Sequence, residues 1–239
     1  MAIQPWRTAT VIKIENETED TRKFWLQFPD LETFDFIPGQ FVTLDLPIHA
    51  KSNKRWRSYS IASNPNGTNI IELLIVLDKN GAGTPYLFNE IKVGSQLTAR
   101  GPQGVFTIKD PIENDIIMIC TGTGIAPFRS MVKHLYLHNI YHKNIYLVFG
   151  CRTKASLLYY NEMKQLQNEM LNFHFIPTLS REQWEGKSGY VHPVYEEICK
   201  DKRPANFFLC GWKGMIDEAK NKILEMGYDK KSIHLEIYG

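Results

Sequence analysis

Short apolar or alternating runs, separated by turn residues, make up the first part of the chain from Trp6 to Arg100. Alternation between apolar and polar side chains is typical of a β-strand with one buried face. Six such runs in fewer than a hundred residues predict an antiparallel β-barrel or sandwich, and we take the barrel as the expected fold. The runs are TATVIKIE, RKFWLQF, QFVTLDL, RSYSIAS, IIELLIVL and SQLTAR.

The pattern changes at Asp115, where apolar runs of the buried-strand type begin to alternate with helical stretches. The helical stretches start near Pro127, Leu158, His192 and Met215, and the strand runs are IIMICT, NIYLVFG, NFHFIPTLS and ANFFLCG. Strands that alternate with helices predict a parallel sheet covered by helices on both faces. We therefore expect a Rossmann-like, doubly wound α/β second half.

The polar segment KDPIEND, residues 109–115, belongs to neither pattern and predicts the domain boundary. A chain of 239 residues suits two domains of roughly 100–150 residues each. We therefore expect a β-barrel domain over 1–110 and an α/β domain over 111–239.

Composition and charge narrow the class of protein. A hydrophobic content of 43% and a charged fraction of 23% exclude a disordered chain. A net charge of +2 gives nucleic-acid binding no compositional support. No run approaches the roughly 18 apolar residues that a membrane span needs, and no leader-like segment follows Met1. We expect a cytoplasmic protein without a membrane span.

Cysteine and histidine spacing predicts no metal site. The four cysteines form no Cys-x-x-Cys pair, so neither an iron–sulfur cluster nor a zinc knuckle is encoded. His134, His138 and His142 are spaced to share one face of a helix, but we expect that helix to end at Asn139 and no carboxylate or thiolate accompanies them. A solvated face is the better interpretation.

A glycine-rich turn follows the strand run IIMICT and opens a helix. Gly122, Thr123 and Gly124 offer backbone N–H groups and a positive helix end to a pyrophosphate, and Pro127 suits the first helical turn. The turn lacks the GxGxxG fingerprint. Taken alone, the turn is as compatible with an ordinary tight strand-to-helix connection as with a phosphate-binding site.

In the first half, the strand run RSYS places Arg57 and Tyr59 on one face and Ser60 on the other. A guanidinium and a flat ring on one face can hold a phosphate and an aromatic ligand. Alone, the same pattern is an ordinary strand with a surface arginine and a half-buried tyrosine.

Six motifs in one order change this balance: RSYS, GAGTPYL, GPQGVF, GTGIAPFR, CGWKGM and HLEIYG. Together they resemble the ferredoxin–NADP⁺ reductase superfamily over essentially the whole chain. The resemblance implies an FAD-binding barrel, a pyridine-nucleotide α/β domain and no fused iron–sulfur domain.

For the barrel, the resemblance implies that Arg57 pairs with the FAD pyrophosphate, Tyr59 lies against the isoalloxazine ring and Ser60 hydrogen-bonds near flavin N5. Gly83 and Thr84 resemble the phosphate-contacting turn. The next residue departs from that pattern, because it is a proline and has no N–H to donate.

For the α/β domain, the resemblance implies that the Gly122–Pro127 turn receives the NADP⁺ pyrophosphate. The plant-type branch of the family has a cysteine, a glutamate and a terminal tyrosine around the nicotinamide, and Cys210, Glu236 and Tyr238 are their counterparts. Without the resemblance, the cysteine is a buried core residue, the glutamate is a solvated charge at the C-terminus and the tyrosine is a frayed last residue. Gly239 after the tyrosine is a departure.

The run after the third α/β strand indicates which nicotinamide cofactor is used. A 2′-phosphate needs cationic and hydroxyl donors, which Ser180, Arg181, Lys187 and Tyr190 supply, with Arg152 as a further candidate. The set resembles the family's pocket for this phosphate. We expect NADP in preference to NAD, although a polar loop after a strand has the same composition.

These features predict an oxidoreductase that carries electrons between NADPH and a ferredoxin or flavodoxin through FAD. The cationic stretch KSNKRWR, residues 51–57, is an ordinary wet loop or a surface that steers an acidic carrier. The rival functions are the reductase component of an oxygenase system and a non-catalytic flavin-binding subunit.

Overall fold

The computed structural model describes residues 4–238. The chain divides into two compact units. The barrel unit contains the residues up to Thr107 together with Arg129–His134, and the α/β unit contains Ile108–Phe128 and the residues from Leu135 onward.

Six strands of the barrel unit form one antiparallel sheet in the order β4-β3-β6-β1-β2-β5. An antiparallel bridge between Ile61 and Leu73 links the β4 end of the sheet to β5, which curls the sheet toward closure. The expected antiparallel barrel architecture is thus confirmed. The strands are β1 (Trp6–Asn16), β2 (Thr21–Gln27), β3 (Phe41–Asp45), β4 (Trp56–Ser60), β5 (Ile70–Val76) and β6 (Gln96–Gln103).

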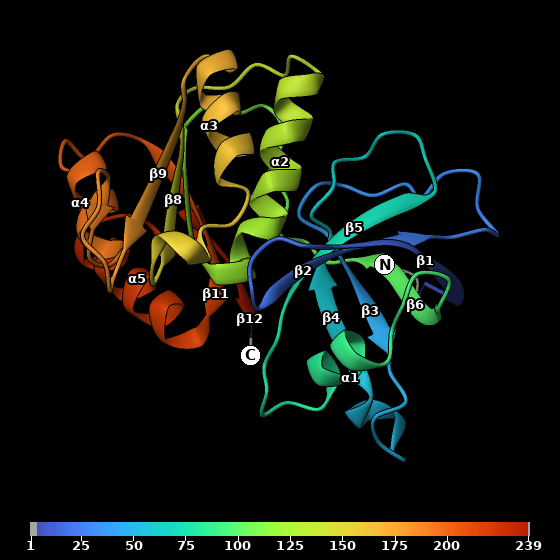
Figure 1. The fold of residues 1–239 in the computed structure, drawn as a ribbon. Helices are drawn as coiled ribbons and strands as arrows, with labels where there is room; N and C mark the ends of the chain where they lie inside the picture. Colours follow the sequence, from blue (N-terminus) through green and yellow to red (C-terminus); the bar gives the residue numbers. More distant parts are fainter. Residues whose placement is uncertain (1–3, 239) are drawn as a thin grey trace. The chain divides into compact units, whose positions relative to one another are not determined.

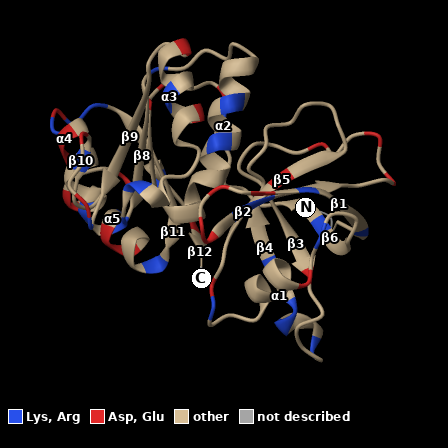
Figure 2. Cartoon of the chain, viewed as in Figure 1, with Lys and Arg blue, Asp and Glu red and all other residues tan. Residues whose placement is uncertain are grey.

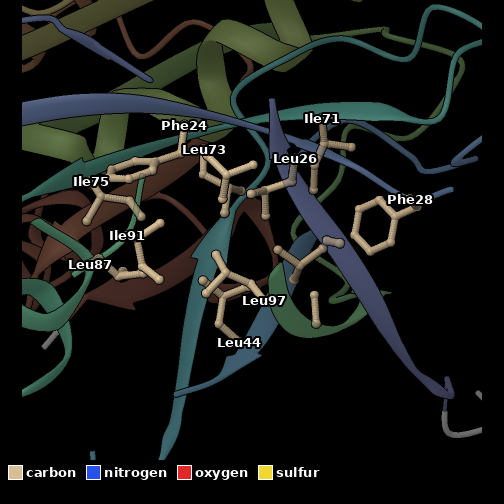
Figure 3. Packing of buried hydrophobic residues seen from close by; sticks show 14 of the residues in the cluster. Phe24, Leu26, Phe28, Leu44, Ile71, Leu73, Ile75, Leu87, Ile91 and Leu97 are labelled. Atoms are coloured by element: carbon tan, nitrogen blue, oxygen red, sulfur yellow. The ribbon is translucent and has the colours of Figure 1, made fainter. Parts of the chain in front are cut away.

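Alternating residues of these strands fill the barrel core (Figure 3). One helix, α1 (Gly83–Asn89), adds fully buried Leu87 to that core. The sequence pattern predicts only a turn here, and a helix is found because Leu87 gives the segment an apolar anchor. A 3₁₀ turn, η1 (Ser52–Lys54), precedes β4.

The α/β unit contains a parallel sheet in the order β10-β9-β8-β7-β11-β12. The strand order reverses between β7 and β11, as in doubly wound folds. The strands are β7 (Asp115–Thr121), β8 (Ile145–Cys151), β9 (Phe173–Leu179), β10 (Lys187–Ser188), β11 (Ala205–Trp212) and β12 (Ile233–Tyr238).

Helices cover both faces of this sheet (Figure 1). The residues of α4 and α5 share a core with Ile117 and Ile119 on one face, and α2 and α3 lie over the other face. The helices are α2 (Ile125–Leu137), α3 (Tyr160–Glu169), α4 (His192–Ile198) and α5 (Lys213–Glu225), with 3₁₀ turns η2 (Gly122–Gly124), η3 (Lys154–Ser156) and η4 (Lys230–Ser232). The expected parallel α/β fold is confirmed.

Helix α2 ends at Leu137, two residues before the predicted end at Asn139, so His138 and His142 both lie beyond the helix. The cause is a Schellman motif around Asn139, which has φ 49°. The N–H of Asn139 donates to the Tyr136 carbonyl oxygen (3.2 Å) and that of Ile140 to the Leu135 carbonyl oxygen (3.0 Å). Within residues 4–238, no helix is both long and apolar enough to cross a membrane.

Candidate functional site

Strand β4 holds Arg57 and Tyr59 on one face and Ser60 on the other, as alternation requires. Tyr59 pairs with fully buried Val42, so its face is turned toward the barrel core. Burial raises the pKa of the Tyr59 phenol to about 12, and the nearby Arg57 opposes that rise. Tyr59 therefore offers a neutral ring beside a guanidinium, while Ser60 on the other face is only 4% exposed.

Arg57 lies against the start of α1. A Cβ atom on Gly83 would come within 3.1 Å of the Arg57 Cγ and Nε atoms, so the glycine lets the arginine stem approach the helix closely. Arg57 Nη1 donates to the carbonyl oxygens of Lys54 (3.1 Å) and Trp56 (2.8 Å). A guanidinium held this way beside a bare glycine fits the charge and space needs of an FAD pyrophosphate.

Thr84, the next residue of α1, uses its hydroxyl within its own turn. The hydroxyl accepts the Asp78 N–H (2.8 Å) and donates to the Asp78 carbonyl oxygen (3.1 Å). Pro85 is the third helical residue and adds no N–H. The phosphate role of Thr84 stays a prediction, and its hydroxyl would have to leave Asp78 to fulfil it.

In the α/β unit, two glycine backbones meet where the strand order reverses. A Cβ atom on Gly124 would lie 2.4 Å from the Cys210 carbonyl oxygen, and one on Gly211 would lie 2.5 Å from Thr121 Oγ1. Both contacts are far shorter than a carbon atom allows. These glycines therefore let the end of β7 and the end of β11 touch.

Gly122 differs, because it faces open space. It has φ +53°, and a Cβ atom there would meet no atom of residues 4–238 within 4 Å. Thr123 beside it is half-buried, and Pro127 is the third residue of α2, where its missing N–H leaves no helix bond unmade. An open glycine turn at the start of a thirteen-residue helix fits a dinucleotide pyrophosphate.

The carboxyl ends of β11 and β12 bring Cys210, Glu236 and Tyr238 together. Cys210 pairs with Glu236 in the parallel ladder and Trp212 pairs with Tyr238. Burial raises the pKa of the Cys210 thiol well above its usual value and the Glu236 charge adds to the rise, while a hydrogen bond from the Tyr238 hydroxyl opposes it. Cys210 is therefore a neutral thiol, suited to packing and weak hydrogen bonding but not to nucleophilic attack.

Beyond β9, Ser180 and Arg181 line a hollow of about 390 Å³. Arg152 directly follows β8 and lies outside this lining, but its backbone adjoins it, since its carbonyl oxygen accepts the Arg181 N–H (2.9 Å). Among the described residues, exposed Lys187 and Tyr190 lie outside this lining. A larger hollow of about 530 Å³ opens near the amino end of β9, and none of the predicted site residues lines it.

Two residues that the sequence patterns do not single out take part in these arrangements. Gly211 lies in the quoted motif CGWKGM, and its φ of +145° identifies a position that favours glycine. Glu182 directly follows Arg181 and is one of the residues that line the hollow. A charge of the wrong sign in a phosphate pocket is the signal that could have drawn attention to Glu182.

Comparison with known proteins agrees with the two-unit architecture. Residues 8–108 match the family model of the oxidoreductase FAD-binding domain, and residues 118–221 match that of the oxidoreductase NAD-binding domain. Together these matches cover most of the chain.

Individual relatives have different partners. The ferredoxin–NADP reductase B of Sorangium cellulosum is 29% identical, with 96% of each chain covered. The anthranilate 1,2-dioxygenase electron transfer component of Acinetobacter baylyi is 30% identical over 86% of this chain, which spans only 59% of that relative's length. A cytochrome P450 reductase of Amycolatopsis superposes with a TM-score of 0.87 at 25% identity, covering 99% of this chain and 71% of that one. The chain belongs to the ferredoxin–NADP⁺ reductase superfamily, with an FAD-binding barrel and an NAD-binding α/β domain.

Proposed function

We propose that this protein is a reductase that takes electrons from NADPH and passes them, through FAD, to a one-electron protein carrier of the ferredoxin or flavodoxin type. The observation that carries the proposal is the meeting of Cys210, Glu236 and Tyr238 at the carboxyl end of the parallel sheet. Ligands of doubly wound folds bind at that edge, next to the reversal of strand order. Bound FAD supplies the conversion of a two-electron hydride donor into single electrons.

The chain's own residues then bind the flavin and the nicotinamide and orient them toward each other. Arg57 neutralises the FAD pyrophosphate, Tyr59 presents a neutral ring to the isoalloxazine, and Ser60 donates a hydrogen bond near N5. The neutral Cys210 thiol packs against the nicotinamide, and Glu236 supports it. Orientation is the main requirement, since hydride transfer needs the reacting atoms about 3–3.5 Å apart.

The remaining parts of the proposed nucleotide site are the glycine turn before α2 and the pocket beyond β9. Backbone N–H groups of Gly122, Thr123 and Gly124 receive the pyrophosphate, at the helix that contains Pro127. The 2′-phosphate binds among Arg152, Ser180 and Arg181, with Lys187 and Tyr190 closing from the exposed side. The four free thiols suit a reducing compartment, and we propose a cytoplasmic location.

A second candidate is the reductase component of an oxygenase system, and the similarity to the Acinetobacter electron transfer component favours it. In that case the acceptor would be a separate cluster-containing protein. A non-catalytic flavin subunit is less well supported, because the residues proposed to act on the nicotinamide lie together.

Anaerobic titration of the FAD-loaded protein with NADPH and with NADH tests the proposal. We expect NADPH to bleach the flavin, and we expect subsequent addition of ferredoxin or flavodoxin to restore its colour. Reoxidation only by an oxygenase or its cluster protein would favour the second candidate. Absence of bleaching by either nucleotide would identify a non-catalytic subunit.

A further inference from the structure

The loops that follow β8 and β9 are held side by side by main-chain hydrogen bonds. The Ser180 N–H donates to the Cys151 carbonyl oxygen (3.0 Å), and the Arg181 N–H donates to that of Arg152 (2.9 Å). These bonds continue the β8–β9 ladder beyond the strand ends. Two exposed arginines, Arg152 and Arg181, are thereby kept on adjoining backbones.

Glu182 fastens the same two loops through its side chain. Its Oε2 atom accepts the N–H of Lys154 at 2.7 Å. Lys154 is the first residue of η3, and the preceding Thr153 makes no side-chain cap for that turn. The Thr153 side chain does not cap the Lys154 N–H group. Glu182 caps this group instead, from the neighbouring loop.

Glu182 is also an acidic residue in the lining of the hollow of about 390 Å³, together with Ser180 and Arg181. Its neighbour Glu185 is outside that lining and pairs with the Lys154 ammonium group (Nζ to Oε1, 3.0 Å). Figure 2 shows both signs of charge in the β10 region of the α/β unit. A pocket dedicated to a 2′-phosphate favours a uniformly cationic lining. The lining of this hollow is not uniformly cationic.

We propose that Glu182 is a specificity-determining and positioning residue of the nucleotide pocket, and this inference rests on the proposed function. Its hydrogen bond to Lys154 keeps Arg152 and Arg181 on adjoining loops. Its charge repels a 2′-phosphate and so moderates the preference for NADPH over NADH. The two effects have opposite signs, and two substitutions separate them.

Glu182→Gln keeps an oxygen acceptor for the Lys154 N–H and removes only the charge. We expect it to bind 2′,5′-ADP roughly fivefold more tightly than wild type, the scale of one partly solvated charge interaction. Binding of 5′-AMP, which lacks the 2′-phosphate, should be unchanged. The gain should shrink at high salt, because screening weakens charge repulsion.

Glu182→Ala removes the charge and the acceptor together. We expect it to bind 2′,5′-ADP roughly three- to tenfold more weakly than the Gln variant, the scale of one lost hydrogen bond. Glu185→Gln is the matched control, since it removes a carboxylate of the same loop from outside the lining. It should leave the ratio of 2′,5′-ADP to 5′-AMP affinities as in wild type.

Isothermal titration calorimetry of the FAD-loaded full chain with 2′,5′-ADP and 5′-AMP measures these affinities without any turnover. A wild-type preference for 2′,5′-ADP that Glu182→Gln leaves unaltered would overturn the charge effect. Equal affinities of the Gln and Ala variants would overturn the positioning effect. If wild type shows no preference for 2′,5′-ADP, the 2′-phosphate part of the proposed function fails, and this inference fails with it.

Discussion

Two glycines, one in each unit, occupy similar places and face different surroundings. Gly83 opens α1 in the barrel unit, and Gly124 lies in the turn that opens α2 in the α/β unit. A Cβ atom on Gly83 would meet the flexible side chain of Arg57 at 3.1 Å, whereas one on Gly124 would meet the Cys210 carbonyl oxygen at 2.4 Å. The first neighbour can move, and the second belongs to the backbone of a central strand.

The same contrast runs through both candidate sites. In the barrel unit, side chains of one strand form the site, and cross-strand register determines which way Arg57 and Tyr59 point. In the α/β unit, backbone at the carboxyl ends of β7 and β11 forms the turn, and close packing fixes it. The barrel site should therefore adapt to small changes that the α/β site cannot absorb.

The largest expected effect is on folding stability. Gly124→Ala should destabilise the protein by about 3 kcal/mol, because the added carbon collides with rigid backbone. Gly83→Ala should change stability by less than about 1 kcal/mol, since alanine's helix preference offsets the crowding of Arg57. Urea unfolding curves of the two variants measure the difference.

Gly122→Ala is the control for backbone conformation. Gly122 has the positive φ but open space, so this variant should cost about 1–2 kcal/mol from conformation alone. If the Gly124 and Gly83 variants lose equal stability, the contrast between a rigid and an adaptable turn is wrong.

Much of the fold follows from the sequence because burial repeats along the chain. The alternating runs of the barrel and the apolar runs of the α/β unit each satisfy one period over several residues. Helix α1 cannot be predicted in this way, because seven residues with two buried positions are too few to show a helical period. Strand β12 cannot be predicted in this way either, because its residues are only partly buried or exposed.

The sequence predicts which residues belong to the candidate site but not which contacts they make with one another. The motifs name Cys210, Glu236 and Tyr238, yet their meeting depends on the register between β11 and β12. The bond between Glu182 and the Lys154 N–H joins two loops, and no local pattern encodes it. Long-range register and loop conformation are set by packing, which a single sequence does not display.

The next effect compares one side chain from each unit. Ser60→Ala and Cys210→Ala should each retain FAD and slow the hydride step by about a hundredfold, the usual result of misplacing reacting atoms by about 1 Å. Stopped-flow measurement of flavin bleaching by NADPH gives this rate.

Each variant has a matched control, on the same strand for Ser60 and on the paired strand for Cys210. Ser58 lies on the same face of β4 and bonds Thr43 (3.0 Å), and Cys120 is the buried partner of Cys210 on β7. Ser58→Ala and Cys120→Ala should bleach near the wild-type rate. Wild-type bleaching by both Ser60→Ala and Cys210→Ala would remove these residues from the proposed site.

A smaller effect concerns the α/β unit alone. Arg181→Ala should weaken NADPH binding by about 1.5–3 kcal/mol, the scale of a charged hydrogen bond, and leave NADH nearly unchanged. Steady-state kinetics with both nucleotides measure the split. An equal loss for both would mean that Arg181 supports the loop without contacting a 2′-phosphate.

The smallest expected effect concerns Tyr238, the last described residue of β12, whose hydroxyl bonds Cys210. We propose that its ring covers the flavin face that the nicotinamide must use. Aromatic stacking contributes about 0.5–1.5 kcal/mol beyond burial, so an incoming nicotinamide must displace that much. Tyr238→Ser should therefore strengthen NADP⁺ binding up to about tenfold and produce a flavin–nicotinamide charge-transfer band absent from wild type.

Tyr238→Phe keeps the ring and loses only the bond to the thiol, so it should retain the wild-type NADP⁺ difference spectrum. If the Ser variant also keeps the wild-type spectrum and affinity, the ring does not compete with nicotinamide, and Tyr238 serves only to hold the Cys210 thiol at the end of β11.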